Sequence, residues 1–207
     1  MRVVDAQREI RQGYMGGFMG QMVSGLLWLA SAVVATWSSP RSAIVLIVVG
    51  GFFIFPLTRL GLALIGHRVA ITPGNPLNGL AMQVAFTLPL SLPVIGAAAL
   101  YRIDWFYPAF MIILGAHYLP FVFLYGMRVF AVLSAMLVSA GIVLALYVPL
   151  FFAAGAWLTS GLLLLFAVAG RWIAVREARD LECGHDNLEL PANKPLQPTS
   201  GARTEVE

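Results

Sequence analysis

Long runs of apolar residues dominate the chain between residues 17 and 170. An α-helix needs about 20 apolar residues to cross a hydrocarbon core about 30 Å thick, and six windows of the sequence reach that length. Turn-forming or charged residues separate most of these windows, as at Thr72-Pro73-Gly74-Asn75-Pro76. The pattern predicts an all-α integral membrane bundle of six transmembrane helices, over residues 17–37, 43–64, 80–100, 105–125, 129–147 and 150–170.

The break between the fifth and sixth windows is the weakest, because it contains only Tyr147 to Pro149 and no charge. We interpret it as a tight hairpin. The alternative is one bent helix of more than 40 residues, which would be far longer than a bilayer requires.

The positions of Lys and Arg indicate the orientation, since cytoplasmic loops carry an excess of positive charge. With the N-terminus inside, only Arg41 and Arg102 of the 13 Lys and Arg residues fall on the outer side. Six spans then place the C-terminus inside as well. We therefore expect an N-in/C-in, multi-pass protein of the cell inner (plasma) membrane.

The chain divides into a cytoplasmic N-terminal lead, a six-helix transmembrane domain and a cytoplasmic, largely disordered tail, over residues 1–16, 17–170 and 171–207. In the lead, Val3, Ala6 and Ile10 would share one face of an interfacial helix. The tail is polar and rich in proline, a composition too poor in apolar residues to fold alone.

A cleaved signal peptide is the alternative interpretation of the N-terminal segment, with Ala30-Ser31-Ala32 as its cleavage site. Asp5 and Glu9 lie ahead of the apolar run, and hydrophobicity continues past the site to Trp37. Both features favour a retained anchor.

Composition supports the membrane class and excludes others. Hydrophobic residues make up 59% of the chain and charged residues 11%, against about 45–50% and about 25% in soluble domains. The net charge is +3, but the arginines lie between the apolar runs and form no basic face that could bind nucleic acid. We expect the lipid bilayer as the partner and no nucleic acid.

Cofactor and enzyme chemistry have little support in the sequence. Cys183 and His185 in the tail are two metal-capable side chains, whereas a structural zinc site needs about four ligands. The metalloprotease motif H-E-x-x-H, the elbow G-x-S-x-G and paired carboxylates in the core are all missing. We expect no metal, no cofactor and no enzymatic activity.

His117 is the most suggestive polar residue. It lies 11 residues before Arg128, so at about 1.5 Å per residue its backbone lies about 16 Å from the inner boundary, near mid-membrane. Ionisable groups at that depth are often functional. A structural alternative is a neutral imidazole that bonds a neighbouring helix or the carbonyl freed by Pro120.

Two further patterns have both a functional and a structural interpretation. Prolines within predicted helices can mark a transporter's binding site or simply kink the helices; they are Pro56, Pro89, Pro93 and Pro120. The small residues Gly16, Gly20 and Ser24 form a ladder that favours close helix packing within the chain, with a dimer face as the alternative.

At Gly74-Asn75-Pro76-Leu77 and Gly115-Ala116-His117-Tyr118-Leu119-Pro120 the sequence resembles a family of uncharacterised bacterial multi-pass membrane proteins, known as a domain of unknown function. The stretch from Arg11 to Trp28 also looks like that family's first helix. The resemblance covers about residues 8–150 and implies a bacterial inner-membrane protein without an assigned activity. It makes Asn75 and His117 candidates for a polar site, without carrying over a role.

Two functions fit these features. The first is a small transporter or channel-like protein, a homo-oligomer around kinked helices with His117 facing the interior. The alternative is a non-transporting accessory or sensory membrane subunit, whose helices only pack and whose arginine-rich cytoplasmic ends bind lipids or partners. The sequence identifies no substrate.

Overall fold

Helices form nearly all of the chain that the computed structural model describes, which is residues 1–67, 69, 71–147 and 151–188, with side chains as far as Arg176. No strand occurs in that part. In chain order the helices are α1 (Val3–Gly13), α2 (Phe18–Trp37), α3 (Pro40–Gly51), α4 (Ile54–Leu64), α5 (Leu77–Tyr101), α6 (Phe106–Tyr125), α7 (Val129–Leu146) and α8 (Ala154–Leu188). Two short 3₁₀ turns, η1 (Met15–Gly17) and η2 (Ile103–Trp105), precede α2 and α6.

The predicted all-α, multi-pass membrane bundle is confirmed. Five of the described helical segments are long and apolar enough to cross a bilayer, and α3 with α4 makes a sixth if the pair counts as one span. The prediction of one continuous helix over residues 43–64 is wrong, since α3 and α4 meet at a 62° bend. Gly50 and Gly51 end α3, and Pro56 has no amide hydrogen to donate back across the break.

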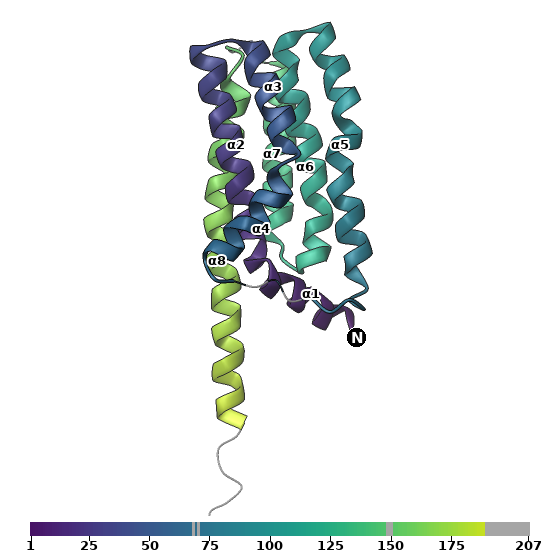
Figure 1. Ribbon diagram of the computed structural model, residues 1–207, viewed down its shortest axis with the longest axis vertical. Coiled ribbons are helices and arrows are strands. Elements are labelled where there is room, and N and C mark those ends of the chain that lie inside the picture. The colour runs from purple at the N-terminus through teal and green to yellow at the C-terminus, as the bar shows by residue number, and fades with distance from the viewer. Residues whose placement is uncertain (68, 70, 148–150, 189–207) are drawn as a thin grey trace, which may run out of the picture. The chain divides into compact units, whose positions relative to one another are not determined.

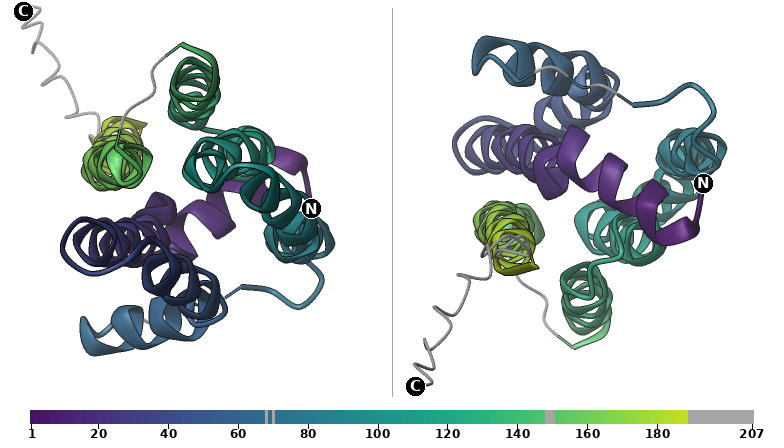
Figure 2. Two further views of the ribbon diagram at one scale, coloured as in Figure 1. Left: turned by 90° about the horizontal axis from the view of Figure 1, so that it is seen from above. Right: turned by 90° about the horizontal axis from the view of Figure 1, so that it is seen from below.

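The chain forms two compact units, residues 1–174 and 175–207. In the first, α2 packs against α3 and α4, and α6 packs against α5 and α7 (Figures 1 and 2). The α6–α7 contact is close because two glycines face it. A Cβ on Gly115 would lie 2.9 Å from the Ser134 carbonyl oxygen, and one on Gly141 would lie 2.9 Å from that of Pro108.

Helix α6 is the most buried of these spans and α5 the least. Within their apolar windows, 44% of the residues are buried in the α6 span and 11% in α5. The outer face of α5 carries large apolar side chains, including Leu90 and Leu100, that are 75% and 91% exposed. Such a face suits lipid rather than water.

Helix α1 lies across one end of the bundle, here named the α1 end (Figures 1 and 2). Its Ala6 and Ile10 are buried, as the predicted interfacial face requires, whereas Val3 is exposed. The chain turns into α2 through Met15, Gly16 and Gly17, all with positive φ. Glycine adopts this backbone without strain, and a Cβ on Gly16 would also lie 3.1 Å from the Gly170 carbonyl oxygen.

The beginning of the predicted disordered tail is helical, because α8 continues to Leu188. Its residues 174–182 are Ala, Val, Arg, Glu, Asp and Leu, most of which are good helix formers. The rest of that prediction, residues 189–207, lies outside the described residues, as do the last two residues of the predicted hairpin at 147–149.

Candidate functional site

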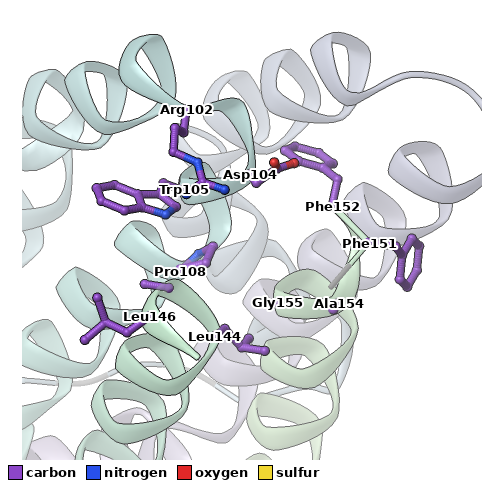
Figure 3. Close-up of a pocket in the computed structure, with 11 residues that line it drawn as sticks. Arg102, Asp104, Trp105, Pro108, Leu144, Leu146, Phe151, Phe152, Ala154 and Gly155 are labelled. Atoms are coloured by element: carbon purple, nitrogen blue, oxygen red, sulfur yellow. The ribbon is translucent and has the colours of Figure 1, made fainter. Parts of the chain in front are cut away.

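A cavity of about 320 Å³ opens at the end of the bundle opposite α1. Three segments enclose it: the α5–α6 connection with the start of α6, the end of α7, and the start of α8 with the residues just before it (Figure 3). Ligand cavities in proteins measure about 300–1,000 Å³, so this one suits a small molecule. Its lining is Arg102, Asp104, Trp105, Pro108, Leu144, Ala145, Leu146, Phe151, Phe152, Ala154 and Gly155.

The two charged residues of the lining both come from the α5–α6 connection, and both side chains are exposed. The guanidinium carbon of Arg102 lies 5.6 Å from the centre of the Trp105 ring, a cation–π contact. In the described part of the chain no ion pair joins Arg102 to Asp104. The cavity therefore presents a positive and a negative group whose charges do not neutralise each other by contact.

The cavity floor forms where α8 approaches α6. A Cβ on Gly155 would lie 2.8 Å from the Cβ of Tyr107, so only glycine allows this approach. The Tyr107 ring packs against Phe152 with centroids 4.8 Å apart, and Tyr107 is fully buried. Phe152 thus lines the cavity, and the buried Tyr107 ring packs against it.

Beneath this floor lies a buried hydroxyl pair. The oxygens of Tyr107 and Ser31 lie 2.6 Å apart, and Ser31 donates a hydrogen bond of 3.1 Å to the Ala43 carbonyl oxygen. Trp28 lies one turn earlier in α2. Its ring centroid is 5.7 Å from that of Tyr107 and 5.0 Å from that of Phe110. Trp28 separates this hydroxyl pair from the polar groups nearer the α1 end.

Those groups are Ser24 and Gln21, which are 6% and 4% exposed. The side chain of Ser24 interacts with that of Tyr118 on α6. The Oε1 atom of Gln21 is buried without a hydrogen-bond partner. Gln21, Ser24 and Ser31 follow each other at helical spacing on the buried face of α2, and we name these three residues the α2 polar line.

The predicted site residue His117 lies outside both the cavity and the α2 polar line. Its Nδ1 atom is 3.0 Å from the hydroxyl oxygen of Thr87, which in turn donates to the Val84 carbonyl oxygen. The imidazole also packs against Phe121, with ring centroids 5.2 Å apart. His117 therefore joins α6 to α5, at the position that the structural alternative describes.

The other predicted site residue, Asn75, lies at the α1 end and is 3% exposed. Its amide nitrogen donates to a Glu9 carboxylate oxygen at 2.6 Å and to the Ala6 carbonyl oxygen at 3.2 Å. The other Glu9 oxygen accepts from the backbone nitrogen and hydroxyl of Thr72, at 2.7 and 2.5 Å. We name Glu9, Thr72 and Asn75 the clasp, because they fasten α1 to the α4–α5 connection.

The clasp favours the charged form of Glu9. Hydrogen bonds from the Thr72 side chain and backbone, and then from the Asn75 side chain, lower the pKa of Glu9 below its usual 4.5. Two contacts assist the clasp: Gln7 donates to the Phe123 carbonyl oxygen at 2.5 Å, and the His67 ring lies 3.1 Å from the Gln12 carbonyl oxygen. Helix α1 is thus held at several points across its end of the bundle.

The structure does not bring Asn75 and His117 together, and the sequence interpretation missed the cavity. Arg102 served there only as one of the two arginines assigned to the outer side. One signal was available: Asp104 is the only acidic residue between Glu9 and Glu177, and it lies two residues from one of the two arginines assigned to the outer side.

Comparison with known proteins identifies the family but no relative of known structure. Residues 3–171 match the model of a family of unknown function (DUF7010). The match exceeds the range of about 8–150 that the motifs suggested, and it includes the first half of α8. No curated protein and no solved structure matches the chain.

Proposed function

We propose a function from the geometry of the bundle. The chain belongs to DUF7010, a family of unknown function, so family membership supplies no role. The proposed function is that of a small transporter that takes up a solute in the cavity and releases it at the α1 end. One observation carries this proposal: the two ends of the α2 polar line differ. The cavity is open near one end, and α1 is fastened by the clasp near the other.

The buried polar side chains support a path through the bundle. Polar groups within a membrane protein are costly, so they tend to face the interior or a pathway. Gln21 Oε1 has no partner, and a buried amide oxygen without a hydrogen bond costs about 1–3 kcal/mol. A passing solute or water would satisfy it.

Alternating access needs two closures that can open in turn. Tyr107, Phe152 and Trp28 are the closure next to the cavity, and α1 with its clasp is the closure at the other end. We propose that α1 turns about Met15, Gly16 and Gly17, where the positive φ angles separate it from α2. In this scheme the structure corresponds to the state that is open at the cavity.

The distribution of arginines supports an N-in/C-in orientation in the plasma membrane, with the cavity outside. Sidedness is tested in a background where Cys183, the one cysteine, is replaced by serine. A membrane-impermeant thiol reagent should reach Gln12→Cys only from the cytoplasmic side and Ser38→Cys only from outside, since both positions are exposed. The reverse pattern would contradict the proposed orientation.

Transport itself is tested at Ser24→Cys in the same background. Alternating access exposes this position to each side in turn, so an impermeant thiol reagent should modify it from both sides of sealed vesicles. Ser134→Cys is the matched control, because Ser134 is also 6% exposed but lies on α7, outside the α2 polar line. Equal protection of both cysteines from both sides would argue against a path.

A non-transporting accessory subunit is the second candidate, and α8 favours it. This helix has 35 residues, of which Ala154–Arg176 suffice to span a bilayer. The remainder, residues 177–188, is rich in charged residues and would suit a cytoplasmic partner. Co-purification of a partner that is lost when residues 177–207 are deleted, together with protection of Ser24→Cys, would favour this function over transport.

A further inference from the structure

We propose that the cavity binds a small zwitterion, a molecule with an ammonium group and a carboxylate or phosphate on a short apolar body. This inference rests on the proposed function, since it names the class of solute for the same cavity. It is carried by the chemistry of the lining: one cation, one anion and a wall of apolar side chains.

Arg102 would bind the anionic group. A guanidinium offers parallel N–H donors that match a carboxylate or phosphate. The Trp105 ring lies 5.6 Å from the guanidinium carbon, and this contact restricts the arginine to the cavity rim, where Figure 3 shows it. A restricted side chain loses less entropy when a ligand binds.

Asp104 would bind the ammonium group. It lies two residues from Arg102, within η2, so the two charges reach the rim from one short segment. A ligand with only one charge would be attracted by one of these residues and repelled by the other. A zwitterion of matching polarity is attracted by both, which favours it over either singly charged analogue.

The facing wall would hold the apolar body. Leu144 and Leu146 come from the end of α7, and Phe152 from the turn that precedes α8. None of the lining residues of this wall carries a charge. With a volume of about 320 Å³, near the lower limit of the usual range of about 300–1,000 Å³, the cavity suits a molecule as small as an apolar amino acid.

The test uses leucine as the zwitterionic probe, with leucinamide and N-acetyl-leucine as analogues that keep only the ammonium or only the carboxylate. Binding to the purified full chain in detergent is measured by isothermal calorimetry, with tryptophan fluorescence as a second measurement. Since a hydrogen bond to a charged group contributes about 1.5–3 kcal/mol, leucine should bind at least about tenfold more tightly than either analogue.

Two variants assign the charges. Arg102→Gln should weaken leucine binding about tenfold but should not weaken leucinamide binding, because it removes the charge that repels this analogue. For the same reason, Asp104→Asn should weaken leucine binding but not N-acetyl-leucine binding. Both side chains are exposed, so neither change should unfold the chain. Arg41→Gln is the matched control, because Arg41 is an exposed arginine outside the cavity lining.

The zwitterion proposal is overturned if a singly charged analogue binds as tightly as leucine, or if neither leucine nor a zwitterionic lipid binds. A lipid headgroup is the other source of the same chemistry. If phosphatidylethanolamine, but not phosphatidylglycerol, binds with the same dependence on Arg102 and Asp104, the class is supported and its source is the bilayer. The labelling of Ser24→Cys needs no ligand, so it tests the transport proposal independently of the zwitterion proposal.

Discussion

The amide of Asn75 donates a hydrogen bond of 2.6 Å to the carboxylate of Glu9, a residue 66 positions earlier in the chain. This contact joins the N-terminal helix to the connection between α4 and α5. Because Asn75 is also bonded to the Ala6 carbonyl oxygen and is almost completely buried, it is the central residue of the clasp.

Replacing Asn75 by alanine should therefore loosen α1. The change leaves the Ala6 carbonyl and one Glu9 oxygen without their donor, at a cost of about 1–3 kcal/mol in the free energy of unfolding. Denaturant titration in detergent measures the total effect, and limited proteolysis of α1 measures the local one. Asn78→Ala is the control, since Asn78 makes one longer bond of 3.3 Å to Thr72; an equal effect of both variants would contradict the central role of Asn75.

The clasp should also depend on pH. The folded-state pKa of Glu9 is lowered from 4.5, so its charged form is favoured by folding. The contribution of Glu9 is complete above about pH 4.5 and is lost as the pH falls through the lowered folded-state pKa. Proteolysis of α1 by an acid-tolerant protease should accelerate below this pH in the parent chain. Glu9→Gln should remove that acceleration, and an unchanged profile in this variant would assign the pH dependence to another group.

The contact of α6 with α7 gives a sharper stability test. A Cβ at Gly141 would lie 2.9 Å from the backbone oxygen of Pro108, so Gly141→Ala should overpack the contact and cost about 1–3 kcal/mol. Gly96→Ala is the matched control in α5, where nothing lies within 4 Å of the added Cβ. It should be neutral or stabilising by up to about 1 kcal/mol. Unfolding in a denaturing detergent compares the two, and equal stabilities would contradict the close packing.

The hydroxyl pair beneath the cavity should show measurable coupling. A double-mutant cycle of Tyr107→Phe and Ser31→Ala isolates the interaction across their 2.6 Å contact. Hydrogen bonds between membrane helices contribute about 0.6 kcal/mol on average and up to about 1.7 kcal/mol, so we expect a coupling energy in this range. A coupling energy of zero would mean that the two hydroxyls do not interact in the folded protein.

Much of the fold follows from periodicity and span length alone. Apolar runs and the charges at Arg102 and Arg128 locate most helices to within a few residues, because the hydrocarbon core sets the length. The break at Gly50-Gly51 was missed, since an apolar window reports hydrophobicity and not helix continuity. The helical start of the tail was missed because polar composition hid a run of good helix formers.

The candidate site was harder to predict. Asn75 was named as a candidate for a polar site, but its partner Glu9 lies in α1, 66 positions earlier, and only tertiary structure pairs them. His117 attracted notice for its depth, yet depth alone does not distinguish a pathway from a contact with Thr87. The cavity needs residues 102–108 to meet residues 144–146 and 151–155, and the approach of Gly155 to Tyr107 leaves no mark in a sequence pattern.

One measurement tests the transport proposal most directly. It compares, with Asn75 intact and with Asn75→Ala, the rates at which an impermeant thiol reagent modifies Ser24→Cys from each side of the membrane. If α1 closes one end of a path through the bundle, loosening the clasp should shift modification of Ser24→Cys toward the cytoplasmic side and reduce it from the outside. Ser134→Cys should stay protected in both backgrounds. Modification that is unchanged in rate and sidedness, while α1 has become sensitive to protease, would contradict a transport path closed by α1.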